Sequence, residues 1–145
     1  MDALTLIIEG EIPRPMFKRD MCKEASWELV KDTREPIEIA VGDLELATFL
    51  NHDEQFVMGE EMAKRAKNIG AMLGQRHAEL LLEHQDQIPG EWRKYYILFP
   101  GTVWRGRDDG LFVPCLRWRG GRWCLPFRWL DCRFDSSGRL LRPRK

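Results

Sequence analysis

Three histidines are the first side chains to consider for chemistry, because an imidazole can bind a metal or exchange a proton near neutral pH. His77 and His84 lie seven residues apart, a spacing that puts both on one face of a helix, with Glu83 and Asp86 close by. A metal site there would need a third ligand, such as His52. The pattern favours polar histidines on a helix surface, so a small enzyme that uses His77 and His84 is only the third functional hypothesis.

The known sequence signatures of catalytic and cofactor sites do not occur in this chain. A phosphate-binding P-loop, a dinucleotide-binding glycine fingerprint, a nucleophile elbow and a zinc-protease helix are all missing from the 145 residues. His52 and Asp53 together are an acid–base pair in principle, but no nucleophile or oxyanion-stabilising element accompanies them. We therefore expect a protein that is not an enzyme and that uses no cofactor.

The four cysteines do not have the spacing of a metal or redox site. Cys22, Cys115, Cys124 and Cys132 are separated by 93, 9 and 8 residues, and no C-x-x-C pair occurs. Because the sequence begins without the basic start and long apolar run of a secretory signal, we expect reduced thiols in the cytoplasm. We then expect the cysteines to be small buried apolar side chains, neither bridged nor bound to a metal.

Arginines gather around Gly120-Gly121, a dipeptide typical of a two-residue β-hairpin turn because glycine accepts positive φ at both positions. In this register Arg119 faces Arg122 and Trp118 faces Trp123, since paired residue numbers sum to 241. The same register puts four arginines on one face: Arg117, Arg119, Arg122 and Arg128. Like charges that face each other destabilise a hairpin, so this face predicts binding of an anion.

The opposite face of this hairpin is predicted to be core. Alternation gives it four apolar pairs: Trp118–Trp123, Leu116–Leu125, Pro114–Phe127 and Phe112–Trp129. Pro126 cannot donate the ladder hydrogen bond expected opposite Cys115, so we expect a bulge at that position. The register is then secure only between Leu116 and Leu125.

Charge is divided unevenly along a chain whose net charge is zero. Residues 1–90 hold 10 basic and 18 acidic side chains, whereas residues 91–145 hold 13 basic and 5 acidic ones, so their net charges are −8 and +8. Eleven of those 13 basic residues are arginine, and five of the six tryptophans lie in the same segment. Arginine beside aromatic rings is typical of surfaces that bind phosphates, bases or carboxylates. Alternatively, the two segments face and neutralise each other.

Hydrophobic spacing and breaker residues indicate the elements that carry these side chains. The predicted elements of residues 1–90 are a strand at Ala3–Glu9, a strand at Pro36–Val41, a short helix at Leu44–Leu50 and a long amphipathic helix at Asp53–Gln85. The segment Met16–Thr33 is ambiguous: its first part favours a short helix, and Ser26–Val30 is compatible with a strand. In the long helix Glu61 and Arg65 have the spacing of an i,i+4 ion pair. Gly70 and Gly74 lie inside it, one turn apart, and favour close packing on the sheet.

After Gln87–Gly90, which ends the helix, short apolar runs alternate with turn signals. The runs are Tyr95–Phe99, Thr102–Arg105, Leu111–Arg119, Arg122–Leu130 and Arg139–Leu141. They predict a small antiparallel β meander or partly closed barrel. The expected fold class is α+β, with N-terminal strands and one long amphipathic helix followed by this meander. Residues 1–90 form an acidic segment and residues 91–145 a basic one, as two units or packed as one domain.

The segment Trp104–Trp123 (WRGRDDGLFVPCLRWRGGRW) resembles short prophage-encoded accessory proteins, the class that includes anti-CRISPR inhibitors. The resemblance covers about the last 45 residues. Because anti-CRISPR proteins share no common fold or active site, it assigns no residue a function. It implies stoichiometric inhibition of a host nuclease complex, often by blocking a nucleic-acid path.

Two hypotheses of a binding function rank ahead of the enzyme hypothesis. The first is a phage-type inhibitor that docks on a host protein or ribonucleoprotein complex, with Glu54, Glu60 and Glu61 imitating phosphates and the arginine face holding an acidic or nucleic-acid surface. The second is a direct RNA- or DNA-binding module that uses the arginine face alone. A helix that spans a bilayer needs about 20 apolar residues. The longest stretch without a charged residue, Tyr95–Trp104, is shorter, so we expect no membrane segment and a cytoplasmic protein. The oligomeric state stays open.

Overall fold

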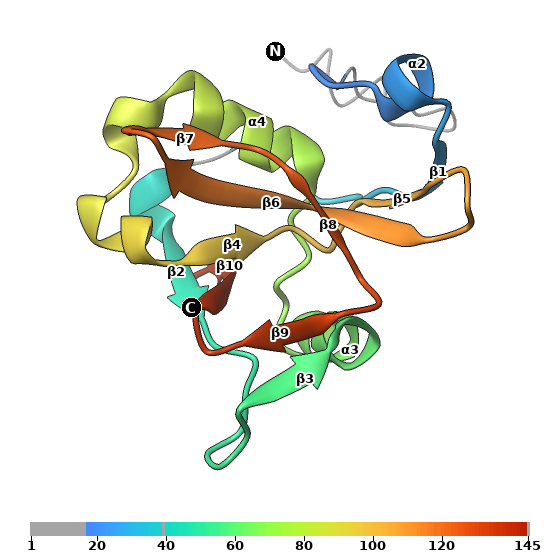
Figure 1. Ribbon diagram of the computed structural model, residues 1–145. Helices are drawn as coiled ribbons and strands as arrows, with labels where there is room; N and C mark the ends of the chain where they lie inside the picture. Colours follow the sequence, from blue (N-terminus) through green and yellow to red (C-terminus); the bar gives the residue numbers. More distant parts are fainter. Residues whose placement is uncertain (1–16, 39, 145) are drawn as a thin grey trace.

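A computed structural model describes residues 17–38 and 40–144 of the chain (Figure 1). Its helices are α2 (Met21–Ala25), α3 (Gly59–Asn68) and α4 (Gln75–Glu83), and its 3₁₀ turns are η1 (Val41–Asp43), η2 (Gln85–Gln87) and η3 (Gly90–Lys94). Its strands are β1 (Glu28–Lys31), β2 (Leu44–Ala47), β3 (Phe56–Met58), β4 (Tyr96–Leu98), β5 (Val103–Arg105), β6 (Leu111–Arg119), β7 (Arg122–Cys124), β8 (Phe127–Trp129), β9 (Arg133–Asp135) and β10 (Gly138–Pro143).

The main sheet is mixed and curled like half of a barrel, which confirms the α+β class. Its strand order is β1-β5-β6-β4-β10-β2, and β7 and β8 both pair with the long strand β6. Strand β10 is parallel to β4, whereas the other pairs of this sheet are antiparallel. Strands β3 and β9 form a separate antiparallel ribbon. The sheet thus takes strands from both the acidic and the basic segment.

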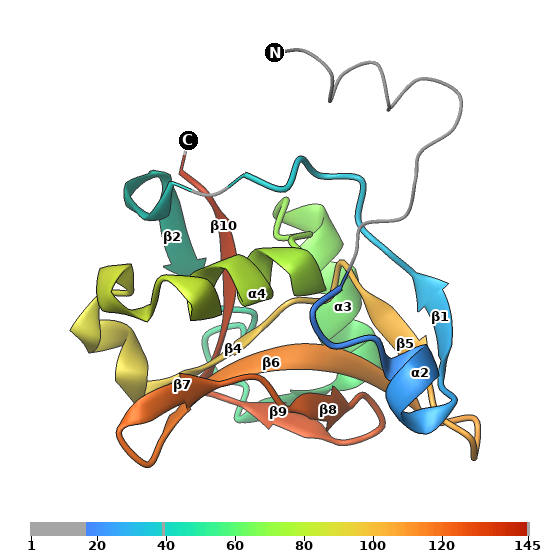
Figure 2. The ribbon, with the colours of Figure 1, turned by 90° about the horizontal axis from the view of Figure 1, so that it is seen from above.

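Hydrophobic cores cover both faces of the sheet. Helix α4 lies on one face, where Leu81 packs with Leu116 and Trp123. Helix α3 and strand β9 lie on the other, where Met62 and Phe134 belong to the second core. In Figure 1, α4 and α3 accordingly lie on opposite sides of β6, and Figure 2 looks down on the molecule from the side of α4. The middle of β6 is therefore buried on both faces, and its arginine face reaches solvent only near the turn.

The predicted long helix is wrong, because two shorter helices, α3 and α4, replace it. Gly70 ends the first with φ +76°, a left-handed conformation that glycine adopts without strain. The second begins after Gly74, where a Cβ atom would come within 2.4 Å of the Thr102 hydroxyl and 2.9 Å of Thr33 Cγ2. The two glycines therefore stop one helix and allow close packing at the start of the next. Apolar spacing alone does not distinguish them from interior positions of one helix.

Two shorter predictions also fail, and one lies outside the described residues. Residues 44–47 form strand β2, because pairing with β10 outweighs the local helix signal of Asp43 and Glu45. The described residues of 36–41 are not a strand. The strand predicted at Ala3–Glu9 lies outside the described residues. Within Met16–Thr33, α2 followed by β1 confirms the short helix and the strand.

The hairpin register is confirmed, and it extends farther than expected. Trp118 pairs with Trp123, and Arg119 with Arg122. The same register resumes between β6 and β8 with Pro114 opposite Phe127, so the expected bulge at Pro126 does not shift it. The five predicted apolar runs all contain strands, but β10 runs parallel to β4, so the sheet is not a simple antiparallel meander.

Truncation of Trp123 tests the core that this register builds. Its side chain is 2% exposed, and its ring packs edge-on against Trp118 with centroids 5.7 Å apart. Removing a buried aromatic ring loses transfer free energy and leaves a cavity, so Trp123→Ala should lower the free energy of unfolding by about 3–5 kcal/mol. Urea denaturation followed by circular dichroism measures this. Trp129→Ala is the control, because Trp129 is 48% exposed; equal midpoints for the two variants would contradict the packing.

Candidate cationic interface

The exposed end of the β6–β7 hairpin carries three of the four predicted arginines. We call Arg117, Arg119 and Arg122 the arginine hairpin. All three side chains are exposed, and Arg119 lies directly across from Arg122. Within the described chain none of the three forms an ion pair with a carboxylate. Residues paired across two strands have Cβ atoms about 5 Å apart, so the two facing charges repel unless an anion lies between them.

On the other face of the hairpin, η3 adds a cation that sequence patterns did not indicate. The Arg93 guanidinium lies 3.8 Å from the centre of the Trp118 ring. Trp118 in turn contacts the buried Trp123 ring, which fixes its position. An arginine stacked on a ring keeps its N–H groups free to donate to an anion. Arg93 is far from the hairpin in sequence, so only the fold brings it to this place.

Arg128 differs from the other three arginines of its face. Its guanidinium lies 4.6 Å from the centre of the Tyr96 ring and 4.7 Å from that of Phe134. One of its N–H groups donates to the Arg133 carbonyl at 3.1 Å. These contacts join β8 to β4 and β9, so Arg128 is engaged inside the fold. The exposed hairpin charge consists of the three arginines of the turn.

The fold also places the three acidic candidates, Glu54, Glu60 and Glu61, in different environments. The Glu54 carboxylate accepts two hydrogen bonds from Arg65, at 2.6 and 3.0 Å, and one from the Asn51 N–H at 2.7 Å. The hydrogen bonds from Arg65 and then from Asn51 lower the pKa of Glu54 to about 2. Arg65 also binds Glu61 at 2.8 Å, which confirms the predicted i,i+4 pair. Glu60 alone is exposed and without an ion pair among the described residues.

The ion pairs show how the two charge segments meet. In the described residues, most ion pairs join two side chains of the acidic segment, as in Arg76 with Glu79 and Glu83. Two join the segments: Arg105–Glu28 at 3.3 Å and Arg142–Glu45 at 2.9 Å. Among the described residues, ion pairs between the segments therefore involve only two cations of the basic segment, Arg105 and Arg142.

The two histidines of the enzyme hypothesis lie in different environments. His77 is fully buried: its Nδ1 accepts a hydrogen bond from the Gly74 N–H at 2.9 Å, and its Nε2 lies 2.7 Å from the Pro36 carbonyl oxygen. His84 is exposed at the end of α4. Over the described ranges, no three His, Cys, Asp or Glu side chains are grouped for a metal. Both ring nitrogens of His77 serve the fold, so this pair does not form a site.

The four cysteines are free thiols in the structure. Cys115 is buried in the core under α3, and burial raises its pKa to about 12. A thiol with so high a pKa is a poor nucleophile. Cys124 and Cys132 donate to backbone carbonyl oxygens of Arg117 and Trp129, at 3.3 and 2.9 Å. Cys115 therefore fits the prediction of a small buried side chain, whereas the prediction is wrong for Cys22, which is exposed, and Cys124 and Cys132 are half-buried.

Comparison of the chain with protein-family models, with curated proteins and with solved structures finds no match. No helix in the described ranges is long and apolar enough to cross a membrane.

The burial of His77 predicts a pH dependence of stability. Desolvation lowers the pKa of His77 below its ordinary value near 6.5, so the folded protein binds fewer protons there than the unfolded chain. The contribution of neutral His77 to the free energy of unfolding is therefore fully present above about pH 6.5. This contribution is lost as the pH falls toward the lower pKa that His77 has in the folded protein. The urea midpoint should therefore fall between pH 7 and about pH 5.

Two glutamine variants assign this pH dependence to one ring. His77→Gln should flatten the change in urea midpoint over that range, because it removes the titrating group. His84→Gln should keep the change, because His84 is exposed. A parent protein whose midpoint is constant from pH 7 to about pH 5 would show that His77 titrates normally.

Proposed function

We propose that this chain is a binding protein without catalytic activity that uses its arginine hairpin to contact the phosphates of nucleic acid. The observation that supports this most is the Arg119–Arg122 pair, which is exposed, directly opposed and without an ion pair to any carboxylate of residues 17–38 and 40–144. A phosphate between two guanidinium groups accepts hydrogen bonds from both and removes their repulsion. The partner thus stabilises a geometry that is unfavourable in the free protein.

The ring-backed Arg93 supports the same proposal. Guanidinium groups recognise phosphates in a fixed, two-pronged geometry, and an arginine held on a ring loses less freedom on binding than a mobile one. The Trp118 ring holds Arg93 in this way, on the face of the hairpin opposite the one that carries Arg119 and Arg122. A strand of nucleic acid at the hairpin end would therefore meet cations on both faces of the turn.

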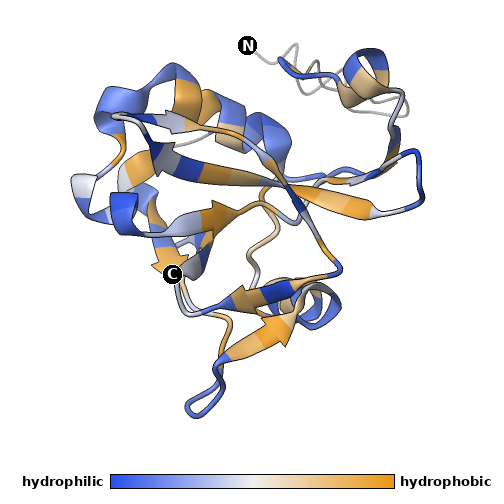
Figure 3. Ribbon diagram, viewed as in Figure 1, coloured by the Kyte–Doolittle hydropathy of each residue, from blue (hydrophilic) through white to orange (hydrophobic). Residues whose placement is uncertain are grey.

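Docking on a host nucleic-acid-processing complex, as anti-CRISPR-type inhibitors do, is the second candidate. An exposed apolar patch on the β3–β9 ribbon favours a protein contact: Phe56 is 39% and Met58 42% exposed. Figure 3 shows the hydrophobic strand β3 at the edge of the molecule, away from the hairpin. Arg133 lies 4.4 Å from the centre of the Phe56 ring and adds charge to this patch. In this version, the hairpin contacts the nucleic acid of the complex and the patch contacts its protein.

Charge reversal of the hairpin tests the proposal. We expect Arg119→Glu/Arg122→Glu to weaken binding of a labelled duplex DNA and of a labelled single-stranded RNA at least tenfold, about 1.4 kcal/mol, because it turns two phosphate contacts into repulsions. For each phosphate of duplex DNA that the variant no longer neutralises, the slope of log affinity against log salt should become shallower by about 0.9. Fluorescence anisotropy across a salt series measures both quantities.

The matched control is Arg107→Glu in the loop before β6. Arg107 is exposed and forms no ion pair within the described chain, so this variant reverses one charge, against two in the double variant, while the hairpin is untouched. Its affinity and salt slope should stay within about twofold of the parent's. The proposal fails if the double variant folds, as judged by circular dichroism, and binds both nucleic acids as the parent does.

Capture from source cells separates the two candidates. A partner complex that survives nuclease treatment and is lost in a Phe56→Ser/Met58→Ser variant would favour docking on a protein complex. Capture that nuclease abolishes, and that the patch variant retains, would favour direct binding of nucleic acid. The double variant Arg119→Glu/Arg122→Glu should lose capture in both cases, because both candidates use the hairpin.

A further inference from the structure

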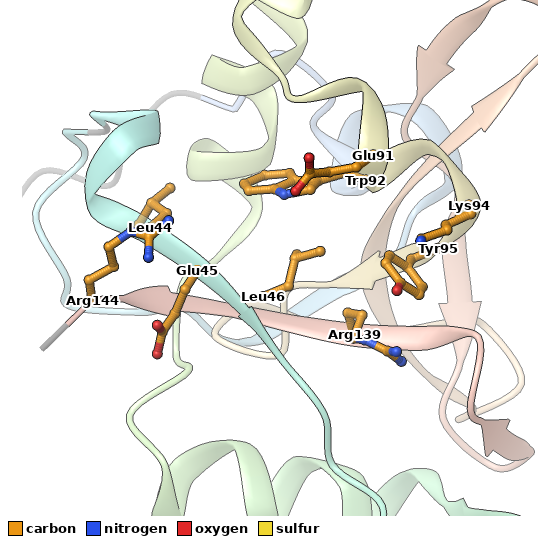
Figure 4. Close-up of a pocket in the computed structure, with 9 residues that line it drawn as sticks. All are labelled: Leu44, Glu45, Leu46, Glu91, Trp92, Lys94, Tyr95, Arg139 and Arg144. Atoms are coloured by element: carbon orange, nitrogen blue, oxygen red, sulfur yellow. The ribbon is translucent and has the colours of Figure 1, made fainter.

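A second cationic surface lies on the other side of η3. A groove of about 330 Å³ opens between η3 and the strands β2 and β10 (Figure 4). Leu46 projects into its middle, below Trp92. Lys94 and Arg139 lie at one end of the groove, and Arg144 lies at the other. The groove is therefore apolar in the centre and positive at both ends.

The groove borders an open sheet edge. Strand β2 ends the sheet order, and among the described residues it pairs with β10 alone. The Arg144 N–H donates to the Asp43 carbonyl oxygen at 2.7 Å, which marks a hydrogen-bonded pair of the antiparallel ladder. Because such pairs alternate along the ladder, Leu46, opposite Leu141, directs its N–H and C=O away from β10. These backbone groups can receive another strand.

The charges of the groove specify an acidic occupant. Its three cations are not engaged in ion pairs anywhere in the described ranges: Lys94, Arg139 and Arg144. Of its two carboxylates, that of Glu45 is held by Arg142 at 2.9 Å. Glu91 remains, so the unpaired charge of the lining is positive.

The aromatic residues of the groove favour a peptide over a nucleic acid. The Tyr95 ring already carries the Lys94 ammonium at 5.3 Å and the Arg139 guanidinium at 4.1 Å from its centre. Trp92 is only 6% exposed. Single-stranded nucleic acid gains affinity by stacking bases on open ring faces, which this groove does not offer. A strand edge beside apolar side chains is instead the usual setting for an added peptide strand.

We propose that the groove binds an extended acidic peptide segment that adds to the free edge of β2. Backbone hydrogen bonds to Leu46 set its direction, and its alternate side chains meet the lining. Carboxylates face Lys94 and Arg139 at one end and Arg144 at the other, while an apolar side chain packs on Leu46. This site shares no residue with the arginine hairpin and does not rest on the function proposed above.

The first test uses a fluorescein-labelled peptide that contains Glu-Ser-Leu-Ser-Glu, because its two glutamates and its leucine lie on the same face of an extended strand. Binding to the full chain is followed by anisotropy. The peptide should bind, and the same peptide with lysine in place of glutamate should bind at least tenfold more weakly, because its charges repel the groove. A version with N-methylated backbone amides should also lose at least tenfold, because it cannot form the strand ladder. Absence of binding up to about 1 mM of the glutamate peptide, or equal binding of either altered peptide, would overturn the proposal.

Variants of the protein locate the site. Lys94→Glu and Arg139→Gln should each weaken the glutamate peptide about tenfold or more, since both remove charge at one end of the groove. Lys67→Glu is the matched control, because Lys67 is exposed on α3 and lines no part of the groove. Circular dichroism and thermal melting confirm that each variant folds. Two folded groove variants that bind the peptide as the parent does would overturn the proposal.

The remaining arms separate this site from the hairpin. Arg119→Glu/Arg122→Glu should bind the peptide as the parent does, whatever its effect on nucleic acid. Unlabelled duplex DNA should leave the peptide bound in the parent protein at physiological salt. Displacement of the peptide by this DNA, with the loss of that competition in Lys94→Glu, would assign the groove to nucleic acid and overturn the peptide proposal.

Discussion

The buried side chain of Gln75, in the first turn of α4, is the contact on which the arrangement of the fold depends. Its Oε1 accepts from the Trp104 indole N–H at 2.7 Å, and its Nε2 donates to the Arg19 carbonyl at 2.7 Å and to Glu79 at 3.0 Å. A buried polar group left without partners costs about 1–3 kcal/mol, so these bonds must form together. Helix α4 is thereby held to β5 and to the chain before α2 in one arrangement.

The end of α4 transmits this arrangement to the hairpin. Gln85, just after the helix, accepts from the Trp123 N–H at 3.0 Å and donates to the Trp123 carbonyl at 3.4 Å. Its side-chain amide thus binds the outer edge of β7 much as a neighbouring strand would. The turn that presents Arg119 and Arg122 is fixed relative to α4, and positively charged groups held by rigid elements lose less entropy when they bind. The same interactions that specify the fold therefore prepare the cationic surface.

Local signals were sufficient for the hairpin, and contacts distant in sequence decided the rest. Gly120-Gly121 predicted the register of β6 and β7, because both glycines have positive φ and the partner strand is adjacent in sequence. Residues 44–47 could not be assigned in this way, because their strand partner β10 lies about a hundred residues later. Apolar spacing predicted Gly70 as an interior helix position, although its left-handed backbone ends the helix. The sequence pattern identified the three arginines of the hairpin as candidate site residues. It did not indicate that Arg93 stacks on Trp118 or that Arg65 binds the Glu54 carboxylate.

The uneven charge of the chain acquires a physical reason from these contacts. Among the described residues, five acidic side chains of the first segment form ion pairs within that segment, as Glu54 and Glu61 do through Arg65. Two neighbouring cations of the second segment lie on opposite sides of η3: Arg93 lies on Trp118 of the hairpin, and Lys94 lies on Tyr95 of the groove. We propose phosphates as the ligands of the hairpin and carboxylates on an extended backbone as those of the groove. Because the two surfaces share no residue, each can be occupied without the other.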